Sequence, residues 1–130
     1  MSGILIDTNA YAAYLAGDKA VFEALTRADS VAVSVIVLGE LHAGFWGGNK
    51  RAENERLLAQ FLSKPRMESL FLTAETARIF GEIKAALRRA GTPIPINDVW
   101  LAAQAIETGR VVVTFDAHFR DVPGLRLWNA

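Results

Sequence analysis

The stretch that decides the fold is "ILIDTNAY", residues 4–11, in which three aliphatic residues are followed at once by an acid, a threonine and an asparagine. A short aliphatic run closed by polar residues is typical of a strand buried on both faces of a parallel sheet. Comparable runs occur at residues 30–35, 69–72 and 111–115, and residues 125–128 could add a short fifth strand. The sequence therefore predicts a sheet of four to five strands.

Helical patterns separate these strands. They are expected at residues 10–15, 19–27, from about 35 to the glycines at 44–48, 49–63, 74–90 and from about 98 to 108. Thr73 is expected to cap the long helix that Gly91 ends, and Asn97 or Asp98 to cap the helix that ends at Gly109. Strands that alternate with helices indicate an α/β fold, with a central, mainly parallel sheet between two helical layers.

Composition and charge narrow the class of protein. The 130 residues are 52% hydrophobic and 22% charged, which predicts one folded domain over residues 1–130. The absence of cysteine excludes disulfides and thiolate metal sites and is compatible with the cytoplasm. Basic and acidic residues balance at 14 each, so no overall positive field attracts nucleic acid. No apolar run reaches the roughly 18 residues of a membrane span, so we expect no membrane association.

Four acidic residues occur where a parallel sheet would gather them. Asp7 and Asp116 end two predicted strands, Glu40 follows the second strand by about one helical turn, and Asp98 opens the helix before the strand at 111–115. Ligands bind at the carboxyl ends of strands in open parallel sheets. We therefore expect the four carboxylates at one edge of the sheet.

Each acid alone has an ordinary structural interpretation. An Asp after a strand is most often a turn or cap residue, whereas Glu40 lies in the almost wholly apolar segment 33–45 and needs a partner or an ion. Two carboxylates about 4 Å apart repel by roughly 4 kcal/mol at an effective dielectric near 20. A cluster of four thus predicts a bound Mg²⁺ or Mn²⁺ and, with it, a phosphodiester substrate.

The two histidines, His42 and His118, give a weaker signal. His42 would diverge from Glu40 on a helix, and the sequence has no HExxH pattern, so zinc is a poor fit. His118 is expected to be a structural or turn residue.

Four segments together resemble a known family: "ILIDTNAY", "SVIVLGELHAG", "PINDVWLAA" and "VVVTFDAHF". Their order and spacing are similar to those of PIN-domain ribonucleases, specifically VapC-type toxins of type II toxin–antitoxin systems, over almost the whole chain. The resemblance implies a PIN-like three-layer α/β/α sandwich. It also implies a Mg²⁺- or Mn²⁺-dependent endoribonuclease that hydrolyses RNA with a metal-activated water, a cognate antitoxin and a homodimer.

The resemblance also assigns residues. Four positions match the family's acidic quartet and are predicted to be catalytic and to bind metal: Asp7, Glu40, Asp98 and Asp116. Thr8 and Asn9 match the polar pair after the first acid, and Thr114 matches a threonine that helps to hold the site in shape. Asp121 is the only candidate for a further acid and is left outside the predicted site.

An acidic site that cleaves RNA needs cations for the flanking phosphates. Lys84, Arg88 and Arg89 cluster on the long helix and are candidates for this contact, although a solvated helix face is the simpler interpretation. The alternatives to an RNase are a DNA-cutting nuclease of the same fold, a non-catalytic binding domain and a phosphoacceptor signalling domain. Asn9 argues against dehalogenase-type phosphatases, which need an acid at that position.

Overall fold

The computed structural model describes residues 3–129 and has a fully parallel sheet in the order β3-β2-β1-β4. Its strands are β1 (Ile4–Ile6), β2 (Val31–Ser34), β3 (Met67–Leu70) and β4 (Val111–Val113). In the middle of the sheet, Leu5 pairs with Ala32 on one side and Val112 on the other. All of β1 and β2 is buried, as expected for apolar runs covered on both faces. The predicted α/β class is confirmed.

Two strand predictions need correction. The strand predicted at 69–72 lies at Met67–Leu70, because it pairs with β2, which stops at Ser34 where that residue caps the next helix. Residues 125–128 add only one isolated bridge, between Val112 and Leu127, so the sheet has four strands in the described part of the chain.

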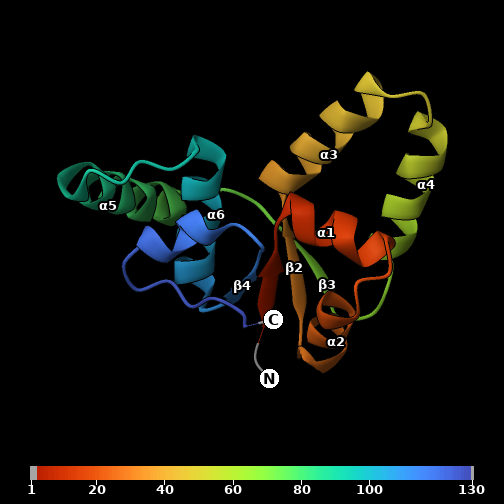
Figure 1. Cartoon of the computed structure of the whole chain (residues 1–130), viewed down its shortest axis with the longest axis horizontal. Coiled ribbons are helices and arrows are strands. Elements are labelled where there is room, and N and C mark those ends of the chain that lie inside the picture. Colours follow the sequence, from red (N-terminus) through yellow and green to blue (C-terminus); the bar gives the residue numbers. More distant parts are fainter. Residues whose placement is uncertain (1–2, 130) are drawn as a thin grey trace.

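The helices follow the predicted alternation. They are α1 (Thr8–Leu15), α2 (Lys19–Arg27), α3 (Val35–Gly47), α4 (Arg51–Leu62), α5 (Ala74–Ala90), α6 (Ile96–Thr108) and a short 3₁₀ helix, Ala117–Asp121. Figure 1 shows α5 and α6 on one side of the sheet and α1, α2 and α4 on the other. The sheet is thus the middle of three layers. No helix within residues 3–129 is long and apolar enough to cross a membrane.

Helix caps decide which polar groups remain available. Thr73 caps α5, and Gly91 ends it in the left-handed conformation (φ 70°), as predicted. The predicted cap of α6 is wrong: the helix begins at Ile96 after Pro95, whose side chain offers no acceptor. The backbone carbonyl of Pro95 accepts the N–H groups of Asp98 and Val99 at the start of the helix. Asp98 therefore lies within the first turn and is not used as the cap.

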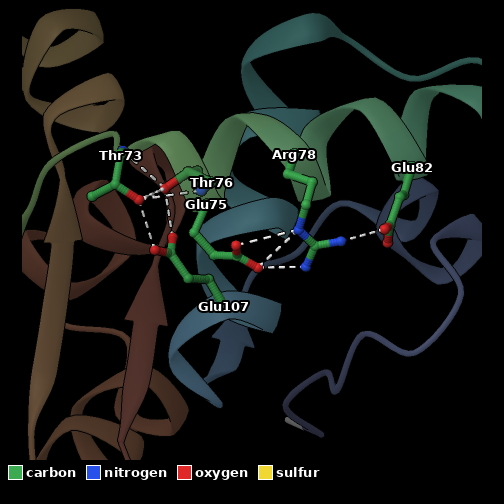
Figure 2. Close-up of polar contacts among 6 residues, drawn as sticks. All are labelled: Thr73, Glu75, Thr76, Arg78, Glu82 and Glu107. Atoms are coloured by element: carbon green, nitrogen blue, oxygen red, sulfur yellow. Dashed lines mark hydrogen bonds and ion pairs between the residues drawn. The ribbon is translucent and has the colours of Figure 1, made fainter.

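A polar cluster joins the start of α5 to the end of α6 (Figure 2). The hydroxyl of Thr73 donates to Glu107 Oε2 at 2.9 Å, and the hydroxyl of the buried Thr76 donates to Glu107 Oε1 at 2.5 Å. Further along the helix, Arg78 pairs with acids one turn before and after it, on an exposed face. These exposed pairs lie within α5 and stabilise little, whereas the contacts of Glu107 join α5 to α6.

The core also fixes the segment that follows β4. Phe119, in the 3₁₀ helix, has no exposed surface and belongs to the main hydrophobic cluster with β1, β2 and β4. A second cluster packs α5 against α6 and includes Val122. Because Phe119 and Val122 are both anchored, the backbone that carries Asp116 and His118 is held against the sheet.

Candidate active site

The strand order places a cavity at the carboxyl end of the sheet. The chain runs from β1 outward to β2 and β3, and then returns to add β4 on the other side of β1. Ligand sites in parallel sheets occur where the strand order reverses in this way. The cavity there has a volume of about 400 Å³ and is lined by Asp7, Thr8, Asn9, Glu40, Pro95, Ile96, Asn97, Asp98, Asp116 and His118. All four predicted acids are among them.

Asp7 is the most buried of the acids, with 4% of its surface exposed. Its Oδ1 accepts the backbone N–H of Ala10 at 2.8 Å, which caps α1, and its Oδ2 accepts the hydroxyl of Thr114 at 2.5 Å. Burial raises the pKa of Asp7, these hydrogen bonds oppose the rise, and the charges of Asp116 and Asp98 add to it. Asp7 is therefore both a helix cap and a wall of the cavity.

Thr114 links the ends of the two central strands. Its hydroxyl donates to Asp7 after β1 and accepts the backbone N–H of Asp116 at 3.0 Å after β4. One hydroxyl group thus sets the positions of both acids.

Glu40 reaches the cavity from α3, which contacts both α1 and α6. Its Oε1 accepts the hydroxyl of Thr8 at 2.6 Å, and its Oε2 accepts the amide of Asn97 at a longer 3.4 Å. The sequence had suggested a partner or an ion for this charge, and both observed partners are neutral donors. Asn97 was not predicted in this role; its only signal is its place beside Asp98.

Asp98 contacts His118, which the sequence predicted to be a structural or turn residue. His118 Nε2 lies 2.7 Å from Asp98 Oδ2. Together with Asp116, these residues offer three ligand atoms that all lie within 4.8 Å of one another. Burial raises the pKa of Asp98, contact with His118 opposes the rise, and the negative charges of Asp116 and Glu40 reinforce it. Only the two-residue spacing from Asp116 could have pointed to His118.

The other residues considered in the sequence lie in different places. Asn9 lines the cavity, whereas Asp121 is exposed and does not. Lys84 and Arg88 line a separate cavity of about 280 Å³, and Arg89 is exposed outside it. That second cavity includes Pro93 and Ile94, and the chain continues from them directly into the wall of the acidic cavity.

The donor set of the acidic cavity fits a divalent cation. No Lys or Arg forms an ion pair with any of its four carboxylates within residues 3–129. Burial raises the pKa of Asp7 and of Asp98, so a cation beside them would favour their charged forms. Carboxylate oxygens suit Mg²⁺ and Mn²⁺, and His118 adds one nitrogen donor.

Comparison with known proteins gives the family. The PIN domain profile matches residues 4–125. Ribonuclease VapC2 of Rickettsia felis is 33% identical over 82% of this chain and 79% of its own length. The tRNA(fMet)-specific endonuclease VapC of Salmonella typhimurium is 37% identical over 73% of this chain and 71% of its own length.

The fold agrees with this sequence similarity. The structure of VapBC2 from Rickettsia felis, bound to a DNA fragment from its promoter, superposes with a TM-score of 0.86 at 29% identity, covering 99% of this chain and 98% of the matched chain. The resemblance noted from the four sequence segments is thereby confirmed. The chain belongs to the PIN-domain family and, within it, to the VapC type.

Proposed function

We propose that this protein is the toxin of a toxin–antitoxin pair and an endoribonuclease that depends on Mg²⁺ or Mn²⁺. The observation that carries the proposal is the gathering of Asp7, Glu40, Asp98 and Asp116 around one cavity at the reversal of strand order. Four carboxylates that pair with no Lys or Arg in the described part of the chain, and with a single imidazole at Asp98, make a cation site, and a divalent cation suits phosphodiester chemistry.

The acids have different roles in this proposal. Asp7, Asp98 and Glu40 hold the main cation, while Asp116 supports it or a second cation that arrives with the substrate. A bound Mg²⁺ or Mn²⁺ supplies Lewis-acid stabilisation of the phosphate charge and lowers the pKa of water. Thr114 fixes the relative positions of Asp7 and Asp116 through its two hydrogen bonds. Thr8 orients Glu40 through the 2.6 Å hydrogen bond.

RNA reaches this site across the end of α5. Lys84, Arg88 and Arg89 form no ion pair in the described part of the chain. Two of them line the cavity beside Pro93 and Ile94. We propose that these cations bind phosphates next to the one that is cleaved, since phosphate contacts supply most of the non-specific affinity for nucleic acid.

The family supports a proposal for the partners and the location. The solved Rickettsia felis relative is a VapBC2 complex, which supports a cognate antitoxin for this chain. We also propose a homodimer, a cytoplasmic location and a single nuclease domain over residues 1–130. A mass measurement in solution, with and without the antitoxin, tests the dimer.

The decisive experiment incubates the purified protein, freed of any partner, with structured RNA and with DNA, in Mg²⁺, Mn²⁺ or EDTA. We expect RNA cleavage that EDTA stops and that Asp98→Asn lowers at least about 100-fold, as expected for loss of a cation ligand. Asp121→Asn is the matched control, because Asp121 is an exposed acid outside the cavity; it should cleave like the wild type.

Other outcomes would contradict specific parts of the proposal. Cleavage of DNA in place of RNA would make the protein a DNA nuclease of the same fold. Cleavage that persists in EDTA would remove the cation from the mechanism, and full activity in Asp98→Asn would refute the assignment of that residue.

A further inference from the structure

The imidazole of His118 lies in the wall of the acidic cavity, although a residue with only a structural role in a turn would not need to be there. Its Nε2 points to Asp98 Oδ2 at 2.7 Å, and its side chain, 32% exposed, opens into the acidic cavity. Asp116 completes a group whose three ligand atoms lie within 4.8 Å of one another. This group holds two of the acids proposed above to bind the cation, so the inference below rests on that proposed function.

The fold holds the imidazole in place. His118 lies in the short 3₁₀ helix directly after Asp116, and the next residue, Phe119, is fully buried in the core. The two rings lie 5.0 Å apart, centre to centre. Because Phe119 anchors this turn, His118 is presented to the cavity by a rigid element.

The other histidine shows a contrasting arrangement. The His42 side chain is 49% exposed, and its Nδ1 lies 3.7 Å from Glu55 on the neighbouring helix α4. His42 is not among the residues that line the acidic cavity. The chain therefore contains one histidine at the site and one away from it, which makes His42 a natural control.

His118 Nε2 and Asp98 Oδ2 lie at hydrogen-bond distance, 2.7 Å. Neighbouring ligands of an octahedral ion with bonds of about 2.1 Å stand roughly 3.0 Å apart, so an ion that replaced this hydrogen bond would need the two atoms to move only slightly. Mg²⁺ is bound mainly by oxygen and keeps its waters, whereas imidazole is a ligand of transition metals. A nitrogen donor in this place thus has a chemical consequence for the choice of ion.

We propose that His118 is a direct nitrogen ligand of the divalent cation, together with Asp98 and Asp116, and that it makes the site prefer Mn²⁺ to Mg²⁺. The four carboxylates alone would accept either ion. The imidazole shifts the balance because it contributes more to binding Mn²⁺ than to binding Mg²⁺.

Calorimetric titration of Mn²⁺ and Mg²⁺ tests the selectivity. In His118→Ala we expect the Mn²⁺ affinity to fall at least about 10-fold, the Mg²⁺ affinity to fall less, and both to stay unchanged in His42→Ala. Circular dichroism checks that each variant is folded. An unchanged Mn²⁺ affinity in folded His118→Ala, or equal losses for the two ions, would overturn the inference.

Pulsed electron paramagnetic resonance of bound Mn²⁺ tests the ligand directly. A coordinated imidazole gives a nitrogen modulation, which we expect in the wild type and in His42→Ala but not in His118→Ala. Mn²⁺ binding that Asp98→Asn abolishes, without nitrogen modulation in the wild type, would reject His118 as a ligand while leaving the proposed nuclease site intact. Absence of any Mn²⁺ or Mg²⁺ binding would instead overturn both proposals.

Discussion

Asp7 shows how one residue serves both the fold and the site. Its carboxylate caps α1 and accepts a hydrogen bond from Thr114, yet it is buried and pairs with no Lys or Arg among residues 3–129. Burying a charged group is unfavourable unless an opposite charge compensates it. Before a cation binds, the ionised carboxylate therefore lowers the stability of the fold.

This arrangement predicts an unusual dependence of stability on pH. Burial raises the pKa of Asp7, so the folded protein binds the proton more tightly than the unfolded chain does, for which an ordinary Asp has a pKa of about 3.9. Stability in EDTA should then fall as pH rises from that value through the pKa of the folded state. Asp7→Asn, which carries no charge, should raise the melting temperature at pH 7 and lose this advantage towards pH 4.

Thermal unfolding in EDTA across this pH range measures the effect, and Asp121→Asn serves as the exposed control. Saturating Mn²⁺ should reverse the order at pH 7, because the cation stabilises only the protein that binds it. A lower melting temperature for Asp7→Asn at pH 7 in EDTA would show that the cap and the hydrogen bond outweigh the buried charge.

Thr114 gives a second prediction at the residue scale. Thr114→Val keeps the shape of the side chain but removes both the donor to Asp7 and the acceptor for the N–H of Asp116. We expect RNA cleavage to fall about 10- to 100-fold, as for other residues that orient metal ligands, with the far-ultraviolet dichroism unchanged. Thr114→Ser retains the hydroxyl and should recover most of the activity; equal losses in the two variants would rule out the hydroxyl as the cause.

At the scale of elements, the start of α6 matters most for the site. Pro95 makes Ile96 the first helical residue, which leaves Asn97 and Asp98 in the first turn with side chains directed to the cavity. Asn97 then reaches Glu40 on α3, and Asp98 reaches His118 after β4. The start of α6 thus contacts both α3 and the 3₁₀ helix after β4.

The link between α5 and α6 predicts a change in stability away from the site. Glu107→Ala removes the acceptor of the hydroxyls of Thr73 and Thr76, the second of which is fully buried. A hydrogen bond to a charged group contributes about 1.5 to 3 kcal/mol. Because one of these two bonds is exposed and the other only partly buried, we expect a total loss of about 1 to 3 kcal/mol in the free energy of unfolding. Urea denaturation measures it.

The matched control is Glu82→Ala on the exposed face of α5. It also removes a glutamate that contacts a neighbouring side chain, Arg78, but both groups are exposed. Its unfolding free energy should stay close to that of the wild type. Equal effects of the two variants would mean that the Glu107 contacts add nothing beyond a surface ion pair.

At the scale of the whole molecule, the distribution of basic and acidic side chains should determine where RNA binds. The acidic cavity repels the backbone of RNA, while Lys84 and Arg88 line the neighbouring cavity beside the loop that leads to it. Each phosphate contact on a single strand contributes about 0.7 to the slope of log affinity against log salt. Lys84→Ala with Arg88→Ala should weaken RNA binding and lower that slope by about 1.4.

Fluorescence anisotropy with labelled RNA at several salt concentrations measures this effect. Lys19→Ala with Arg27→Ala is the matched control, since both residues are exposed cations on α2 and line neither cavity. An unchanged slope in the first double variant would place the RNA elsewhere on the surface.

Several parts of this architecture were predictable from local sequence. The apolar runs gave the buried strands, and Thr73 and Gly91 gave the limits of α5, because strand burial and helix caps depend on a few neighbouring residues. The shift of β3 to Met67–Leu70 was not predictable, since its register depends on where β2 ends. The partner of His118 was likewise hidden, because it comes from another helix.

The sequence by itself determined the alternation of strands and helices, and it placed an acid after β1 and another after β4. Only the tertiary structure decided that these strands are neighbours, so that Thr114 meets Asp7 across 107 positions of the chain. It also decided that His118 faces Asp98. The physical reason is that periodicity and caps are local properties, whereas the composition of the site depends on strand order and on the packing of helices that lie far apart in the chain.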